Sequence, residues 1–226
     1  MPLFNLLGAQ ERVVRDVSSR LRNKEINRQA ALKFGREYFD GSREQGYGGY
    51  VYDGRWRPVA ARVIDRYGLK SGSRVLDVGC AKGFLMKDLL DALPGLEVWG
   101  LDVSDYAIRH AHPDVAHRML RASCDRLPWH DGAFDAVLAI NTIHNLDRAG
   151  CMAALREIVR VGRPGRAFVQ VDAYRNESER DLFEAWMLTA KTYCRPEEWR
   201  ALFDETGYDG DYFWTILETD PAWVRT

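Results

Sequence analysis

The stretch VLDVGCAKGFL, residues 75–85, places an apolar run, an acid and a glycine ahead of a second glycine four positions further on. The run ahead of Asp77 predicts a buried strand, and the residues after Gly83 have the apolar spacing of a helix. Glycine suits the corner between them because the chain turns tightly there and must approach a ligand closely. The start of the helix also exposes backbone N–H groups. The stretch therefore predicts a binding corner for an anion or a nucleotide.

The segments on either side repeat this alternation of strand and helix. Strands are predicted at residues 74–78, 97–101, 134–140, 167–171 and 211–218, and helices at 59–67, 152–159, 176–190 and 196–206. Asn176 with Glu179 gives the third helix an N-terminal cap, and Gly68 and Gly207 end the first and the last. Such alternation predicts an α/β fold, with a mostly parallel sheet covered by helices on both faces.

Two other nucleotide corners fit residues 75–85 poorly. A phosphate-binding P-loop requires Gly-x-x-x-x-Gly-Lys-Ser/Thr, which residues 79–83 do not provide. A dinucleotide dehydrogenase requires Gly-x-Gly-x-x-Gly, and Asp77 beside the pyrophosphate would bring two negative groups together. An acid at this place suits a cationic ligand. A nicotinamide-dependent oxidoreductase is therefore a disfavoured alternative.

Asp77, Gly79 and Gly83 resemble the first motif, Asp/Glu-x-Gly-x-Gly-x-Gly, of the class I S-adenosylmethionine-dependent methyltransferases, with Ala81 in place of the middle glycine. The next predicted strand ends in Asp102, where this family binds the adenosine ribose. The resemblance continues in motif order over residues 59–172, through Leu127, Pro128, Phe134 and Asp135.

The resemblance implies a Rossmann-like, doubly wound sheet of about seven mostly parallel strands, the last antiparallel. It implies S-adenosylmethionine as methyl donor and S-adenosylhomocysteine as product, with no metal. The implied cofactor-binding residues are those of the first motif and of the following strand ends: Asp77, Gly79, Cys80, Ala81, Gly83, Asp102, Val103, Ser123, Cys124 and Asn141.

His144 follows the predicted strand 134–140, whose carboxyl end should face the transferring methyl. A histidine titrates near neutrality, so His144 is a candidate general base toward an acceptor hydroxyl. A structural histidine that caps the next helix is the competing interpretation, because methyl transfer needs mainly an aligned nucleophile and can proceed without a base. His110 and His112 have no apparent third partner, and no metal site is predicted.

Residues 1–57 differ in character from residues 58–226, which we expect to form the methyltransferase domain. Basic residues, among them Arg20 and Arg28, recur between apolar ones and predict helices with a solvated basic face. Residues 41–56 are rich in glycine and tyrosine and predict a loop. We expect this segment to act as a lid, with Tyr50 and Arg55 closing over the cofactor and Tyr47 facing the substrate. A packed surface loop is the alternative.

The acceptor side is expected to use residues beyond the strand 167–171. Tyr174, Arg175 and Lys191 are the candidates, and their cationic groups would suit a phosphate, phosphonate or carboxylate. The predicted reaction is in-line methyl transfer to a small molecule, most simply to an oxygen of a sugar, phosphate or natural-product intermediate. A cofactor-binding module without catalysis, or a protein or RNA methyltransferase, remains an alternative.

Composition supports this assignment. The 226 residues carry 32 Lys and Arg against 33 Asp and Glu, so no basic excess predicts a nucleic-acid partner. No run approaches the ~20 apolar residues of a membrane span, and no signal peptide is evident, so we expect a cytoplasmic protein without membrane contact. The four cysteines form no Cys-x-x-Cys pair and are expected to be reduced thiols near the core. A monomer or a homodimer fits equally.

Overall fold

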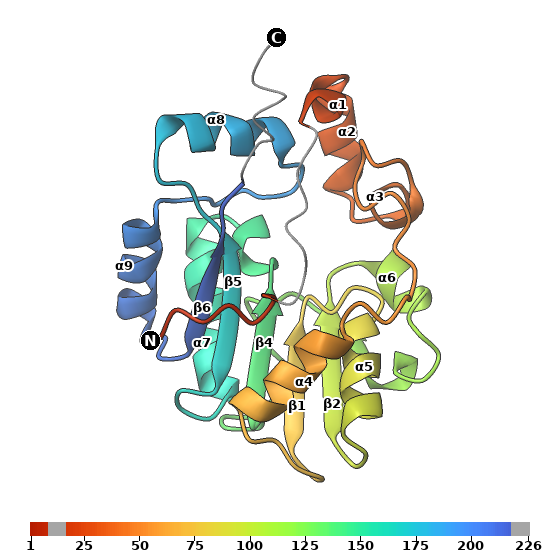
Figure 1. Ribbon diagram of the computed structural model, residues 1–226, viewed down its shortest axis with the longest axis vertical. Coiled ribbons are helices and arrows are strands. Elements are labelled where there is room, and N and C mark those ends of the chain that lie inside the picture. Colours follow the sequence, from red (N-terminus) through yellow and green to blue (C-terminus); the bar gives the residue numbers. More distant parts are fainter. Residues whose placement is uncertain (9–16, 218–226) are drawn as a thin grey trace.

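The computed structural model describes residues 1–8 and 17–217 (Figure 1). In this part of the chain a six-stranded sheet has the order β3-β2-β1-β4-β5-β6, and every neighbouring pair is parallel. The strands are β1 (Arg74–Val78), β2 (Glu97–Asp102), β3 (Met119–Arg121), β4 (Ala136–Ile140), β5 (Ala167–Asp172) and β6 (Asp211–Thr215). The predicted α/β class is confirmed, and the short β3 is an addition to the predicted strands.

The last strand corrects the expectation from the resemblance. Instead of seven strands with an antiparallel end, the described residues contain six, and Val169 of β5 lies opposite Tyr212 in a parallel pairing with β6. The connection between these strands includes two helices. It returns the chain to the amino-terminal ends of the strands, as a crossover between parallel strands requires. Residues 218–226 lie outside the described residues, and with them the end of the strand predicted at 211–218.

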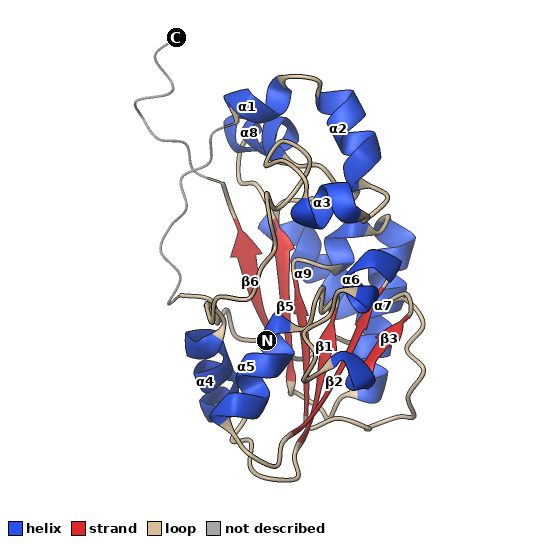
Figure 2. Ribbon diagram, turned by 90° about the vertical axis from the view of Figure 1, so that its right-hand side faces the viewer, coloured by secondary structure: helices blue, strands red, loops and turns tan. Residues whose placement is uncertain are grey.

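Helices cover both faces of the sheet (Figures 1 and 2). On one face α4 (Arg57–Arg66) and α5 (Phe84–Ala92) pack on Val75 and Leu138, and on the other α7 (Arg148–Val161) and α9 (Pro196–Thr206) pack on Leu76 and Val169. Successive strand residues serve opposite cores because side chains alternate along a strand. The cysteines are free and at least partly buried, as predicted.

The remaining helices lie beyond the carboxyl ends of the strands. They are α1 (Ser18–Leu21), α2 (Lys24–Ala31), α3 (Arg36–Asp40), α6 (Asp105–Arg109) and α8 (Glu177–Trp186). Asn176 caps α8 by accepting a hydrogen bond from the Glu179 N–H (2.9 Å), as predicted. Residues 41–56 contain no helix or strand, which confirms the predicted loop. The N-terminal helices and α8 stand above the strand ends in Figure 1, and this is where the sheet receives a ligand.

Candidate functional site

Two adjoining cavities lie at the carboxyl ends of the strands. The larger has a volume of about 560 Å³ and the smaller about 240 Å³. Both are lined by the loop after β1, the end of β4 and the N-terminal segment, through the shared residues Tyr38, Tyr47, Gly79, Ala81, Ile140 and Asn141. The two cavities therefore meet at one junction, beside the predicted glycine corner.

The backbone of the glycine corner is shaped by close contacts. A Cβ on Gly79 would lie 2.2 Å from Thr142 Oγ1, and φ there is +77°, so glycine is required. Ala81 adopts φ +50° and donates its N–H to Asp102 Oδ2 (2.8 Å). That hydrogen bond offsets the strain of a left-handed alanine, which explains why Ala81 can stand where the family motif has glycine.

Asp102 ends β2 at the smaller cavity. Its Oδ1 accepts the N–H of Ser104 (2.8 Å), so each carboxylate oxygen already has one backbone donor and retains acceptor capacity. Val103, Ser123 and Cys124 line the same cavity, as the resemblance implies for the adenosine side. The arrangement can accept hydrogen bonds from two hydroxyl groups of a ribose.

Asp77 lies in the wall of the larger cavity and is 4 % exposed. Its carboxylate accepts no hydrogen bond from the described residues. Burial, followed by the negative charge of Asp102, raises the pKa of Asp77 to about 7. A cationic group beside Asp77 would restore its ionised form. This uncompensated carboxylate fits the positively charged methionine end of S-adenosylmethionine.

Gly83 ends the glycine corner and lines neither cavity. It caps α5 at φ +76°, and a Cβ there would lie 2.7 Å from Val115 Cγ2. Of the predicted cofactor residues, Cys80 and Asn141 do line the larger cavity, whereas the role of Gly83 is close packing.

Asn141 stands at the junction of the two cavities with a left-handed backbone, φ +52°. Gln170 Nε2 donates to Thr215 Oγ1 (3.0 Å), which in turn donates to Asn141 Oδ1 (3.1 Å). With Oδ1 engaged, the amide Nδ2 is left as a donor at the junction. No sequence pattern indicated that β6 would contribute Thr215 to this site.

His144 is held in a way that opposes the predicted base role. It is 5 % exposed, its Nδ1 accepts the Asp172 N–H (3.0 Å), and burial lowers its pKa to about 3. The proton of the neutral ring therefore lies on Nε2, 3.5 Å from Asp172 Oδ2. A ring whose free lone pair is occupied cannot take a proton from an acceptor. The geometry makes His144 a positioning residue for the end of β5, although it does line the larger cavity.

The predicted lid residues line the larger cavity, where Tyr47 and Tyr50 pack with ring centroids 4.6 Å apart. Tyr50 stacks on Phe84 at the start of α5, at 4.8 Å. Arg55 also lines this cavity, but its guanidinium is paired with Asp53 at 2.7 Å. The rings thus lie over the cofactor corner, and Arg55 is at the rim in an ion pair.

A buried ion pair that the sequence did not reveal joins this segment to the corner. Lys82, between Ala81 and Gly83, is 6 % exposed and donates to Asp40 (2.7 and 2.8 Å) and to the Tyr50 carbonyl (2.9 Å). Asp40 also accepts from the hydroxyl of Tyr106 (2.7 Å) and the N–H of Tyr50 (3.1 Å). A lysine within a glycine-rich turn would have been assigned to a ligand or to solvent from sequence alone.

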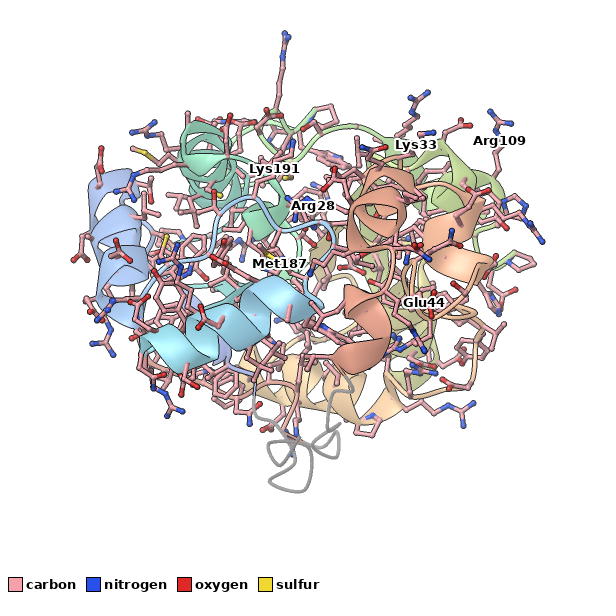
Figure 3. All side chains as sticks on the ribbon, turned by 90° about the horizontal axis from the view of Figure 1, so that it is seen from above. Arg28, Lys33, Glu44, Arg109, Met187 and Lys191 are labelled. Atoms are coloured by element: carbon pink, nitrogen blue, oxygen red, sulfur yellow. The ribbon has the colours of Figure 1, made fainter. Side chains whose placement is uncertain are left out.

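Three basic residues predicted to be solvated contact the end of α8 and the residues after it, which corrects that prediction. Arg20 donates to the carbonyls of Gly46 (2.8 Å) and Trp186 (3.2 Å), and Arg28 to that of Ala190 (3.4 Å). Lys24 donates to the carbonyls of Glu184 and Ala185, and burial lowers its pKa to about 8. Figure 3 shows this face from above, with Arg28 and Met187 between the two groups of helices. The cations satisfy carbonyls at the C-terminus of α8.

The predicted acceptor residues are only partly brought to the cavities. Lys191 lines the smaller one, on the adenosine side. Tyr174 and Arg175 line neither: Arg175 pairs with Glu179, and the Tyr174 ring lies under Arg195 at 5.9 Å. These two belong to the surface around the start of α8.

Neither a metal-ligand cluster nor a membrane-spanning helix occurs in the described ranges. Over residues 1–8 and 17–217, three or more His, Cys, Asp or Glu side chains nowhere gather as a metal site would need. Within the same ranges, every helix is too short or too polar to cross a membrane.

Residues 75–165 match the family model described as a methyltransferase domain. The demethylmenaquinone methyltransferase of Beutenbergia cavernae is 34 % identical over 120 residues, which are 52 % of this chain and 46 % of that protein. The sterol 24-C-methyltransferase of Aspergillus fumigatus is 33 % identical over 129 residues, 51 % of this chain and 33 % of that protein. The chain thus spans less than half the length of these two relatives.

The solved structure of the YcgJ protein from Bacillus subtilis shares the fold, with a TM-score of 0.53 and 17 % identity over 65 % of this chain and 66 % of that one. Because the matched region contains the glycine corner, Asp102 and the end of β4, the family match and the geometry concern the same residues. Over residues 75–165 the chain is therefore similar to methyltransferase domains.

Proposed function

We propose that this chain transfers a methyl group from S-adenosylmethionine to a small-molecule acceptor. The observation that carries the proposal is Asp77, a buried carboxylate that accepts no hydrogen bond from the described residues, in a cavity that adjoins a second one lined by Asp102. A nicotinamide dinucleotide would place a pyrophosphate beside this carboxylate, which electrostatic repulsion disfavours.

Each part of the cofactor has residues suited to it. Asp77 and the backbone of Gly79 to Ala81 would hold the methionine end, Asp102 the ribose, and Ser123 with Cys124 the adenine side. When bound, S-adenosylmethionine supplies an electrophilic methyl on a sulfonium, and the C–S electron pair leaves with sulfur as neutral S-adenosylhomocysteine. The charge on sulfur disappears in this reaction, so a water-poor site favours it.

The protein's part in catalysis is mainly positioning. Asn141 offers its Nδ2 at the junction of the two cavities, where the acceptor must meet the methyl. Donation to an acceptor oxygen would fix one lone pair and leave another for attack. An oxygen nucleophile of a sugar, phosphate, phosphonate or natural-product intermediate fits this arrangement, and its proton would pass to solvent after transfer. The quinone and sterol in the relatives' names support a small-molecule acceptor, and the sterol enzyme's name specifies carbon.

Residues 1–57 would act as the lid of this site, with residues 58–226 as the domain that binds the cofactor. The support is the Lys82–Asp40 ion pair together with the rings of Tyr47 and Tyr50, which join the N-terminal segment to the glycine corner. Such a closure would exclude water and retain the cofactor during transfer.

The test is transfer of labelled methyl from S-adenosylmethionine into a bacterial extract separated into metabolites, protein and nucleic acid. We expect label in the metabolite fraction. The Asp102→Ala variant should bind cofactor more weakly by about 2 kcal/mol or more in calorimetry, because it loses charge-assisted hydrogen bonds. Asp204→Ala, an exposed acid on α9 away from both cavities, is the matched control.

Three outcomes would contradict parts of the proposal. Unchanged cofactor affinity in Asp102→Ala would remove the cofactor assignment. Label in protein or nucleic acid would keep the chemistry and overturn the acceptor class. Tight cofactor binding with no label in any fraction would favour a cofactor-binding module without catalysis.

A further inference from the structure

The part of the larger cavity beyond the cofactor corner has a distinct composition. Its wall is formed by the N-terminal segment and by the end of α8 with the residues after it. Aromatic rings and guanidinium groups dominate this wall: Tyr38, Tyr47, Trp56, Phe183 and Trp186, with Arg20, Arg43 and Arg55. Resting on the methyl-transfer function proposed above, we propose that the acceptor is a small anion with a flat apolar body, whose carboxylate or phosphate is bound by Arg43 beside Trp186.

The rings argue for the flat apolar body. Tyr47 packs against Tyr38 at 5.1 Å and against Tyr50 at 4.6 Å, so it forms a continuous aromatic wall with them at the cavity junction. Met187, Leu188 and Leu217 add aliphatic surface. Flat rings bury well against such a wall, with offset or edge contacts that favour one orientation. A heavily hydroxylated acceptor would leave its polar groups without partners there.

The charges of the wall argue for an anion. Among the described residues, the cavity is lined by three guanidinium groups, of which Arg55 is paired with Asp53, and by the carboxylates of Asp77 and Asp172. Asp77 is assigned to the cofactor, which brings a further net positive charge into the same space. His144 is neutral and adds none. A cationic group on the acceptor would be repelled by guanidinium groups at close range, whereas a carboxylate or phosphate would be attracted to them.

Among the three arginines, Arg43 is the one placed to bind an anion. Arg55 is already paired with Asp53, and Arg20 is committed to the carbonyls of Gly46 and Trp186. Arg43 donates one Nη1 hydrogen to the Tyr47 carbonyl (2.8 Å), and its other N–H groups have no partner within the described ranges. That single bond fixes the fork of the guanidinium and leaves donors for two-pronged binding of an anion.

Trp186 supports this assignment. The guanidinium carbon of Arg20 lies 3.8 Å from the centroid of the indole ring and that of Arg43 lies 5.5 Å away. An anion bound to the Arg43 guanidinium would therefore lie beside the indole ring. The indole would at the same time offer a flat surface to the acceptor. The anion and the ring of the acceptor are thus recognised at neighbouring points.

The experiment separates the acceptor pool by charge before the reaction. A bacterial metabolite extract is passed over an anion exchanger at pH 8, and the flow-through and the eluted anions are each incubated with the full-length protein and labelled S-adenosylmethionine. We expect label with the eluted anions alone, in a product that an apolar reversed-phase column retains at low pH. Separation before the reaction matters because methylation of a carboxylate would remove its charge.

Arg43→Gln tests the residue. Its initial rate with the eluted anions at limiting concentration should fall at least tenfold, while its calorimetric affinity for S-adenosylhomocysteine stays the same. Arg43→Lys should recover only part of the rate, since an ammonium lacks the two-pronged fork. Arg36→Gln, an exposed arginine of α3 outside both cavities, is the matched control and should behave as the wild type.

The results distinguish this proposal from the one on which it rests. Label only with the flow-through, or equal rates for Arg43→Gln and Arg36→Gln, would overturn the anionic acceptor and leave methyl transfer intact. A labelled anion that the apolar column does not retain would overturn the flat apolar body. No label with either pool, despite cofactor binding, would overturn the methyl-transfer function itself.

Discussion

At the scale of the residue, Asp77 holds a carboxylate whose negative charge the described protein does not compensate. Its pKa lies at about 7 in the folded chain against 3.8 for an ordinary aspartate, because of burial and the neighbouring Asp102. The folded state therefore keeps a proton that the unfolded state loses, and ionisation at higher pH disfavours folding. The cofactor's positive charge would reverse this penalty, so binding and protonation are linked.

We expect Asp77→Asn to raise the free energy of unfolding of the cofactor-free protein, and by roughly 2 kcal/mol more at pH 8 than at pH 5. The amide imitates the protonated acid and cannot ionise. Urea denaturation at the two pH values measures this, and the same variant should bind S-adenosylmethionine poorly. A gain that is equal at both pH values would show that Asp77 is not the group responsible.

His144 shows how burial changes a residue's role. Because its Nδ1 accepts the Asp172 N–H and its pKa is lowered to about 3, it stays neutral over the range in which enzymes are assayed. His144→Asn keeps an acceptor near the Nδ1 position and should retain methyl transfer within about tenfold, whereas loss of a general base costs about 10²–10⁴-fold. The rate measured from pH 6 to 9 should have no inflection that the variant removes. A large loss, together with a lost inflection, would restore the base role.

At the scale of the element, α2 is attached to the end of α8 by cations that satisfy backbone carbonyls. Lys24 donates to the carbonyls of Glu184 and Ala185, and Arg28 to that of Ala190. The last carbonyls of a helix have no partner within it, so these bonds cap α8. They also hold residues 186–190, which line the larger cavity.

Lys24→Met should therefore make the end of α8 and the residues after it more mobile without unfolding the sheet. We expect faster amide hydrogen exchange over residues 184–190 and a stability loss of about 1–2 kcal/mol. Lys33→Met, an exposed lysine near α2, is the control that removes a charge without removing those bonds. Equal exchange in the two variants would mean that α2 does not hold this segment.

At the scale of the whole molecule, the Lys82–Asp40 pair couples the N-terminal segment to the cofactor corner. Lys82 follows Ala81, whose N–H is bound by Asp102, and its own ammonium holds Asp40 and the carbonyl of Tyr50. Occupation of the proposed ribose site and the proposed closure of the N-terminal segment would therefore involve consecutive residues of one loop.

We expect S-adenosylhomocysteine to slow hydrogen exchange in residues 34–53 as well as in 97–102. Saturation at one hundred times its Kd should add about 2.7 kcal/mol to stability. In Asp40→Asn the protection of residues 34–53 should be lost while that of residues 97–102 remains, because the ribose contacts do not involve Asp40. Undiminished protection of both regions would show that closure does not depend on this pair.

The order of strands and helices, the glycine corner and the placement of Asp77 and Asp102 followed from the sequence alone. The apolar period and the turn and cap residues are local properties, so strand 74–78 and the capped start of the helix after Asn176 were predicted correctly. That helix ends at Trp186, short of the predicted residue 190. The three-residue β3 was missed because it is too short to show a period. The orientation of β6 was wrong because it came from the family resemblance, whereas the crossover through α8 and α9 dictates parallel pairing here.

Only the tertiary structure decided which residues distant in sequence contact one another. A histidine at a strand end has the same sequence signature whether it is a base or a buried acceptor, and only the position of the Asp172 N–H distinguishes the two. Arg20, Lys24 and Arg28 show a solvated pattern on their own helices, yet their partners are carbonyls some 160 residues away. Local pattern thus determined the cofactor corner, whose residues are close together in the chain. The wall of the larger cavity depends on how separate segments pack.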